Sequence, residues 1–375
     1  MIERHKGVAN GRYSAVKKEE HMAHTIYERL REHLDSLPTG YPKTKSGVEL
    51  KILQKLFTEE EAEMACQLKP VPEPAEQIAQ RLGQDPQAVA DLLYRMSQKG
   101  LIFRIKYKEI YHYMAMMFIV GIFEYQVHKL DREMAELLEA YHQEVMNKEI
   151  LRPQTPQLRV VPVWESLEPA IEIQPYDELR KIVLSQKTIA LADCICREKS
   201  ALLGHPCSKP VETCFLFGPI GEYYIENGIA RRITCEEALK VLQKSEEAGL
   251  VPSPANAQKT AGICNCCGCC CGVLKALKFH SHPSSYVKSN FFAQVDEDLC
   301  TGCETCVERC QIEAISVQED RARIDLKRCL GCGLCVTTCP SKALSLRKKD
   351  AQEAYVPPAK HIDTYLQISK EMGKI

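Results

Sequence analysis

Cysteine is the residue type through which this 375-residue sequence is best equipped to do chemistry. Of its 20 cysteines, Cys66 stands alone in the first 193 residues, and the other nineteen lie between Cys194 and Cys339. Closely spaced thiols are typical of metal sites when they are kept reduced. A secreted disulfide scaffold is not favoured, because the segment from Met1 to Lys6 lacks an apolar signal region. We therefore expect a cytoplasmic, metal-binding protein.

The last eight cysteines form an internal repeat in which Cys300–Cys310 and Cys329–Cys339 both read C-x2-C-x2-C-x3-C. This spacing is typical of bacterial two-cluster ferredoxins, and residues 291–350 resemble that family. The resemblance implies two [4Fe–4S] clusters with ligand sets that cross between the copies. One set would be Cys300, Cys303, Cys306 and Cys339, and the other Cys329, Cys332, Cys335 and Cys310. Paired zinc sites are the less favoured alternative, because they do not explain two complete runs in register.

The segment between the two copies predicts a hairpin. Residues 314–317 and 322–325 alternate like strands around a polar turn, so we expect a βαββαβ ferredoxin-type domain. Gly302 and Gly331 fit a close backbone approach to a cluster. Gln311 stands where the family usually has proline, which leaves the ligand spacing intact but affects the expected reduction potential.

A second cysteine field lies upstream and matches no ferredoxin spacing. Thr234 and Glu237 predict a capping box for a helix ending at Gly249, so Cys235, like Cys66, is expected to be a packing residue. Ten cysteines remain as candidate ligands of one or two further metal sites: Cys194, Cys196, Cys207, Cys214, Cys264, Cys266, Cys267, Cys269, Cys270 and Cys271. Additional [4Fe–4S] clusters are favoured, with zinc or a redox-active thiol cluster as alternatives. Arg197 and Lys199 would either compensate thiolate charge or form a solvated surface.

The cysteine-poor N-terminal half predicts helices followed by a hairpin. Capping signals indicate helices that begin after Thr58, at Ala75 and at Pro86, and the last two end at Gly83 and Gly100. Residues 101–108 and 109–115 alternate as two strands. This order resembles a winged-helix domain, a family that most often binds DNA. Only the hairpin is basic, through Arg104, Lys106 and Lys108, so docking or homodimer formation is favoured over DNA binding.

The remaining segments complete an α+β multidomain prediction. Residues 114–122 are expected to form a buried helix that passes into an amphipathic helix from Glu124 to Val145, and residues 158–163 a short strand. The expected parts are a disordered extension at 1–21, with Met22 as a candidate start, a winged-helix-like domain at 22–147, a proline-rich linker at 148–175, a cysteine-rich α/β domain at 176–290, the ferredoxin-type domain at 291–350 and a tail at 351–375. No apolar run is long enough to span a membrane.

These parts predict an iron–sulfur electron-transfer protein, as an electron carrier or an electron-transfer subunit of an oxidoreductase. Whether the chain is itself an enzyme stays open, because a central domain that reduces a substrate at a cluster is a third possibility. The carrier would relay single electrons to a partner oxidoreductase, ferredoxin or flavoprotein, in an anaerobic host because exposed clusters are oxygen-labile. A redox-sensing winged-helix transcription regulator is the alternative. The sequence contains no dinucleotide-binding fingerprint, P-loop or nucleophile elbow, so nucleotide-binding and serine-hydrolase functions lack support.

Overall fold

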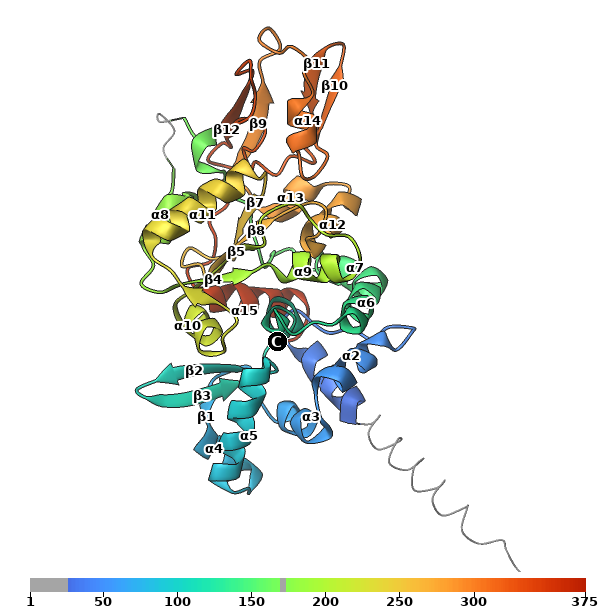
Figure 1. Ribbon diagram of the computed structural model, residues 1–375, viewed down its shortest axis with the longest axis vertical. Coiled ribbons are helices and arrows are strands. Elements are labelled where there is room, and N and C mark those ends of the chain that lie inside the picture. The colour runs from blue at the N-terminus through green and yellow to red at the C-terminus, as the bar shows by residue number, and fades with distance from the viewer. Residues whose placement is uncertain (1–25, 169–172) are drawn as a thin grey trace, which may run out of the picture. The chain divides into compact units, whose positions relative to one another are not determined.

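The computed structural model describes residues 26–168 and 173–375 (Figure 1). The chain divides into two compact units, with the boundary between Phe118 and Ile119. The expectations for residues 1–21 and for Met22 lie outside the described residues. The structure is a mixture of helices and several small sheets, which confirms the α+β class.

The first unit consists of helices and one small sheet. Residues 26–36 are helical. They are followed by α2 (Val48–Leu56), α3 (Glu59–Cys66), β1 (Glu73–Pro74), α4 (Ala75–Leu82), α5 (Pro86–Lys99), β2 (Phe103–Tyr107) and β3 (Ile110–Met114). The three strands are antiparallel in the order β1-β3-β2. The β2–β3 hairpin turns at Lys108 and Glu109, both of which have positive φ angles.

The predicted capping signals of this unit are confirmed. Thr58 and Glu61 form the capping box of α3. Asp85 caps α5 through the backbone N–H of Ala88, with Pro86 in the first turn, and Gly100 ends the helix at φ 82°. The predicted apolar face of α5, from Val89 to Met96, is buried.

The buried helix expected at residues 114–122 was wrong, and the amphipathic helix expected from Glu124 to Val145 is confirmed only from Arg132 onward. Ile119 and Val120 have extended dihedral angles, and the chain is helical only in short pieces until α6 (Arg132–Tyr141). Val120 donates its N–H to Oε1 of Gln157 at 3.0 Å, a partner 37 residues away. A continuous apolar run has no hydrophobic periodicity, so the sequence does not distinguish a buried helix from a buried extended segment.

The centre of the second unit is a five-stranded antiparallel sheet in the order β6-β4-β5-β8-β7. Its strands are β4 (Ile189–Asp193), β5 (Glu212–Phe217), β6 (Arg231–Arg232), β7 (Val251–Pro254) and β8 (Gly262–Cys266). Its helices are α7 (Asn147–Glu149), α8 (Leu179–Leu184), α9 (Ile195–Leu202), α10 (Gly218–Glu226), α11 (Cys235–Glu247), α12 (Gly272–Phe279) and α13 (Pro283–Val287). The backbone of Arg159 and Val161 donates to β7, so the predicted strand at 158–163 extends this sheet, although only as an isolated bridge.

Two antiparallel strand pairs and one helix make up the cysteine-repeat region. β9 (Phe291–Val295) pairs with β12 (Leu344–Lys348), and β10 (Ile315–Gln318) pairs with β11 (Arg321–Ile324). Helix α14 (Thr305–Arg309) lies between β9 and β10. The segment after Leu334, where a second helix was expected, forms turns in the described structure.

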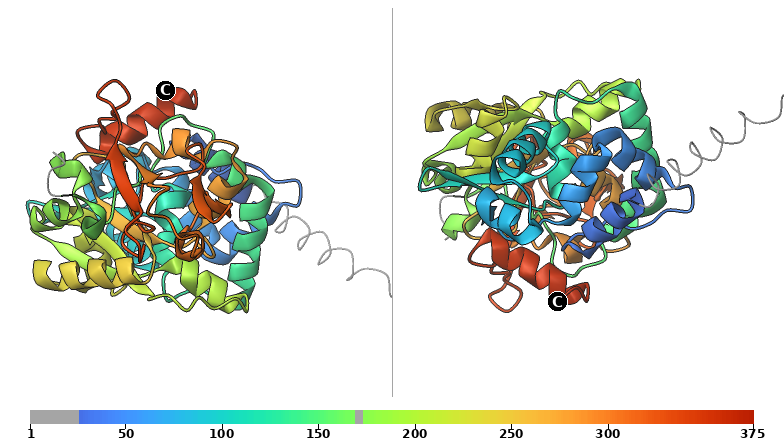
Figure 2. Two further views of the ribbon diagram at one scale, coloured as in Figure 1. Left: turned by 90° about the horizontal axis from the view of Figure 1, so that it is seen from above. Right: turned by 90° about the horizontal axis from the view of Figure 1, so that it is seen from below.

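The chain after residue 350 contains a helix, α15 (His361–Glu371), which lies at the outer edge of the second unit in both views of Figure 2. Glu371 accepts hydrogen bonds from the backbone N–H and the side chain of Thr155, at 2.8 and 2.6 Å. Thr364 and Ile368 are buried. The end of the chain is therefore packed onto the second unit.

Candidate metal centres

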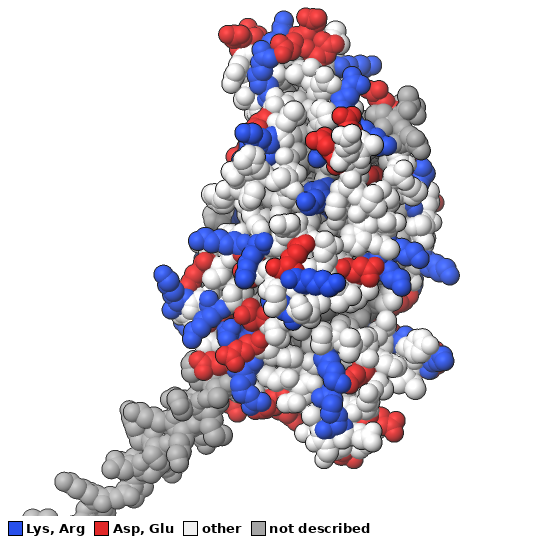
Figure 3. Space-filling model, turned by 180° about the vertical axis from the view of Figure 1, so that it is seen from behind, with Lys and Arg blue, Asp and Glu red and all other residues white. Residues whose placement is uncertain are grey.

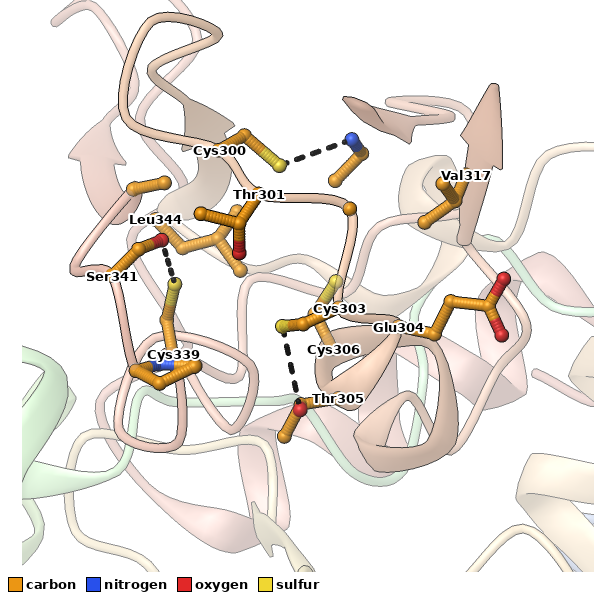
Figure 4. A pocket seen from close by; sticks show the side chains of 14 residues that line it. Cys300, Thr301, Cys303, Glu304, Thr305, Cys306, Val317, Cys339, Ser341 and Leu344 are labelled. Atoms are coloured by element: carbon orange, nitrogen blue, oxygen red, sulfur yellow. Dashed lines mark hydrogen bonds between the residues drawn. The ribbon is translucent and has the colours of Figure 1, made fainter. Parts of the chain in front are cut away.

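The first cysteine pocket lies between the β9–α14 loop and the turn before β12 (Figure 4). Four cysteines line it: Cys300, Cys303, Cys306 and Cys339. The backbone N–H of Ala322 donates to Sγ of Cys300 at 3.3 Å, and Cys303 contacts the Thr305 hydroxyl at 3.5 Å. Cys303 is exposed and Cys306 is buried. The pocket therefore combines three cysteines of the first repeat with the last cysteine of the second, and one thiol faces solvent.

The second cysteine pocket is the counterpart of the first. It is lined by Cys310, Cys329, Cys332 and Cys335, with Ile312, Leu330 and Leu334 around them. Ala314 donates its N–H to Sγ of Cys310 at 3.2 Å, and Ala293 to Sγ of Cys329 at 3.4 Å. Burial raises the pKa of Cys332 to about 12. A bare thiolate is therefore disfavoured here, and a cationic metal is the group that would offset this cost.

The backbone conformation and the nearby carbonyl groups require glycine at one position in each cysteine repeat. Gly302 and Gly331 have φ angles of 66° and 67°. A Cβ atom on Gly302 would lie 2.8 Å from the carbonyl oxygen of Asp320, and one on Gly331 would collide with the carbonyl oxygen of Phe291. Any larger residue would displace the loops that carry Cys303 and Cys332.

A third group of thiols, which we call the four-thiol site, joins two distant segments of the second unit. It consists of Cys207, from the loop between α9 and β5, and Cys267, Cys269 and Cys270, from the loop between β8 and α12. Their four sulfurs all lie within 4.8 Å of one another. Cys207 is 4.0 Å from Cys267 and 3.6 Å from Cys269, and Cys269 is 3.6 Å from Cys270.

The other six candidate cysteines form a closed ring of contacts, which we call the six-thiol ring. Each thiol is within hydrogen-bonding reach of two others, in the order Cys194, Cys196, Cys271, Cys266, Cys264, Cys214 and back to Cys194. The structure thus divides the ten upstream candidates into a set of four and a set of six.

Local secondary structure explains why these six thiols converge. Cys194 and Cys271 are the N-cap residues of α9 and α12, so both helices begin at the ring. Cys264 and Cys266 are two residues apart on β8 and point to the same face of the sheet. Antiparallel pairing of Phe215 with Ile263 brings Cys214 beside Cys264.

Arg197 lies between the four-thiol site and the six-thiol ring. It is 2% exposed, and its guanidinium donates to the Thr213 hydroxyl and to the Asn265 carbonyl oxygen, both at 2.8 Å. Burial alone would lower the pKa of Arg197, but the thiolates of Cys194 and Cys267 raise it above its ordinary value. The guanidinium is therefore a fixed positive charge that both cysteine sets share.

Lys199 is also buried, which rules out a solvated basic surface after Cys196. Its ammonium pairs with Glu139 at 2.5 Å. His142, a residue without a sequence signal, lies next to this pair and so close to Gly272 that no Cβ would fit there. Burial lowers the pKa of His142 to about 4, so the imidazole is neutral at pH 7. Only the tertiary packing of α6 against α9 brings these residues near Cys271.

The upstream cysteines pack directly against the second cysteine pocket. Oε1 of Gln311 accepts the N–H of Gly268 at 3.0 Å, and a Cβ on Gly268 would collide with the Gln311 carbonyl oxygen. One apolar cluster contains Cys266 and Cys271 together with Ile312, Leu330 and Leu334, and Cys310, Cys329 and Cys332 pack against it. The Gln311 side chain thus contacts the loop that carries Cys267, Cys269 and Cys270.

The two cysteines set aside in the sequence lie outside all four groups. The Cys235 thiol contacts the Val183 carbonyl oxygen at 3.9 Å and packs on the core of the central sheet. Burial raises the pKa of Cys66 to about 11. Cys235 is therefore a packing residue, and Cys66 is half-buried.

Comparison with known proteins identifies one part of the chain. Residues 294–349 match the family model of the 4Fe-4S dicluster domain. No curated protein and no solved structure matches the chain. None of the helices in the described ranges is both long and apolar enough to cross a bilayer. The C-terminal match shows an iron–sulfur protein, and the eight cysteines of the two pockets lie within the matched residues.

Proposed function

We propose that this protein relays single electrons through two [4Fe–4S] clusters to a partner oxidoreductase. The observation that carries the proposal is the pair of cysteine pockets, because each contains four thiols and backbone N–H groups that donate to sulfur. N–H···S bonds and burial tune the potentials of such clusters. We assign Cys300, Cys303, Cys306 and Cys339 to one cluster and Cys310, Cys329, Cys332 and Cys335 to the other.

Differences in exposure suggest the direction of the relay. The first pocket carries the exposed thiol of Cys303, whereas the second is enclosed by apolar residues and shares its packing with the six-thiol ring. A [4Fe–4S] cluster supplies one-electron chemistry when bound. The first pocket would exchange electrons with a partner, and the second would pass them toward the ring.

The six-thiol ring is our proposed site of a further iron–sulfur cluster. Its thiols come from the starts of α9 and α12 and from β5 and β8, and each cysteine is buried or half-buried. Within the described residues, no three of its sulfurs all lie within 4.8 Å of one another, so the ring is wider than a single metal ion requires. Four of its thiols would suffice for a cubane.

The first unit is proposed as a docking module for a protein partner. Arg104, expected to be a basic group of the hairpin, is 2% exposed and donates to the Ser97 hydroxyl at 2.7 Å. Lys106 pairs with Glu109. On the face in Figure 3, Lys and Arg are interspersed with Asp and Glu. Among the described residues of this unit, the burial of Arg104 and the pairing of Lys106 do not favour the phosphate contacts that a DNA-binding regulator needs.

Metal analysis of the full chain, purified without oxygen, tests the proposal. Iron and sulfide per chain would be determined together with EPR spectra of the reduced protein. About eight irons are expected if only the two cysteine pockets are loaded, and about twelve if the ring holds a cluster as well. Fewer than about four irons, with no EPR signal after reduction, would overturn the proposed function.

A further inference from the structure

We propose that the four-thiol site binds a single zinc ion in tetrahedral coordination and that this ion fixes the loop that joins the upstream cysteines to the second cysteine pocket. The proposal goes beyond electron transfer, because zinc has no redox chemistry in proteins. It separates Cys207, Cys267, Cys269 and Cys270 from the iron-binding cysteines.

The spacing of the sulfurs fits one tetrahedral metal ion. Zinc–thiolate bonds are about 2.3 Å long, and the edge of such a tetrahedron is therefore about 3.8 Å. The three separations measured in the four-thiol site are 4.0, 3.6 and 3.6 Å. The other three sulfur–sulfur separations are at most 4.8 Å, so movements of up to about 1 Å would bring all four thiols into the coordination sphere of zinc.

The other cysteine sets of the same chain provide an internal comparison. Among the described residues, only Cys207, Cys267, Cys269 and Cys270 form a group of three or more metal-binding side chains whose ligand atoms all lie within 4.8 Å of one another. Neither cysteine pocket of the dicluster domain meets this criterion. The sets suited to a cubane are therefore wider, and the four-thiol site has the dimensions of a mononuclear centre.

The donor set is also that of a closed structural site. All four ligands are protein thiols, which leaves no coordination position for a substrate. Cys267 and Cys270 are buried with Leu250, whereas Cys269 is exposed at the surface.

The position of Gly268 shows what the metal would hold in place. Gly268 stands between two of the proposed ligands, and its N–H donates to Oε1 of Gln311 at 3.0 Å. Gln311 directly follows Cys310 of the second cysteine pocket. Fixing Cys267 and Cys269 therefore fixes the contact between the loop and the dicluster domain, while Cys207 anchors the loop from a segment 60 residues away.

The test begins with wild-type protein, so it does not depend on whether a variant folds. Zinc and iron would be measured in the full chain purified without oxygen, and the zinc environment by X-ray absorption at the zinc edge. The expected result is about one zinc per chain with four sulfur neighbours at about 2.3 Å. Less than about 0.2 zinc per chain, or zinc bound mainly by nitrogen and oxygen, would overturn the proposal.

Substitutions then test whether the cysteines of the four-thiol site bind the zinc ion. Cys207→Ser and Cys269→Ser change ligands from the two different segments, and Cys66→Ser is the matched control outside every site. The two ligand variants should lose most of the zinc and keep their iron, and hydrogen exchange in residues 262–275 should become faster. Loss of about four irons with zinc unchanged would assign the site to a cluster instead. Because zinc and iron are counted separately, failure here is distinguishable from failure of the proposed function.

Discussion

Arg104 and Arg197 illustrate how burial decides the role of a charged side chain. Arg104 lies over the rings of Tyr94 and Tyr111, at 4.8 and 5.4 Å from their centroids. Arg197 lies between two sets of thiols. Each was identified in the sequence by its charge, but the sequence does not show the partners that offset the free-energy cost of burying that charge. The two side chains therefore support different predictions: one concerns the stability of the first unit, and the other the reduction potential of the proposed ring cluster.

Replacing Arg104 by alanine should destabilise the first unit. The substitution removes two cation–π contacts and the 2.7 Å hydrogen bond that the guanidinium donates to the Ser97 hydroxyl, so a loss of about 2 kcal/mol is expected. Hydrogen exchange of peptides from α5 and the hairpin would measure it. Arg95→Ala, at an exposed position of α5, is the control and should change little. Equal protection in the two variants would contradict the packing role of Arg104.

Replacing Arg197 by methionine should lower the reduction potential of the proposed ring cluster. A positive charge favours the more negative, reduced state, so removing one charge beside the cluster should lower its potential by roughly tens of millivolts or more. Anaerobic redox titration followed by EPR would measure the shift. Arg197→Lys retains the charge and should restore most of the potential. An unchanged midpoint in the methionine variant would show that Arg197 serves only to support the fold.

At the level of secondary structure, predictions were correct where the signal is local. Asp85, Pro86 and Gly100 bound α5 because side-chain capping and a positive φ angle depend on neighbouring residues. The hairpin of β10 and β11 was likewise predicted from alternation around a polar turn. The segment after Met114 was not, because its conformation depends on Gln157 and on burial from all sides.

Gln311 provides a test at the level of the loop between β8 and α12. Gln311→Ala removes the acceptor for the Gly268 N–H, and a lost hydrogen bond of this kind costs about 1 kcal/mol. We expect faster hydrogen exchange in residues 262–275, read by mass spectrometry, with iron content unchanged. Gln318→Ala, at an exposed position of β10, is the control. Unaltered exchange in the Gln311 variant would show that the contact does not restrain the loop.

At the scale of the whole molecule, the sequence predicted the crossed ferredoxin ligand sets only through family resemblance, and it left the ten upstream cysteines undivided. Their division into four and six depends on the pairing of β5 with β8 and on the convergence of α9 and α12 at the ring. Spacing along the chain does not encode these contacts: Cys269 and Cys270 join Cys207, whereas the adjacent Cys271 joins Cys196.

Each pocket combines cysteines of both repeats, and this arrangement predicts which cluster accepts electrons first. Cys339 belongs to the second repeat but lines the pocket that contains the exposed Cys303. Cys339→Ser should therefore impair the solvent-facing cluster and lower the iron content by up to about four per chain, whereas Cys310→Ser should affect the enclosed one. Stopped-flow reduction by viologen radical would show which cluster accepts electrons first.

The fast phase of this reduction should disappear in Cys339→Ser and persist in Cys310→Ser, since the enclosed pocket is shielded by Ile312, Leu330 and Leu334. If Cys310→Ser alone removed the fast phase, electrons would enter through the enclosed pocket and the proposed direction of the relay would be reversed.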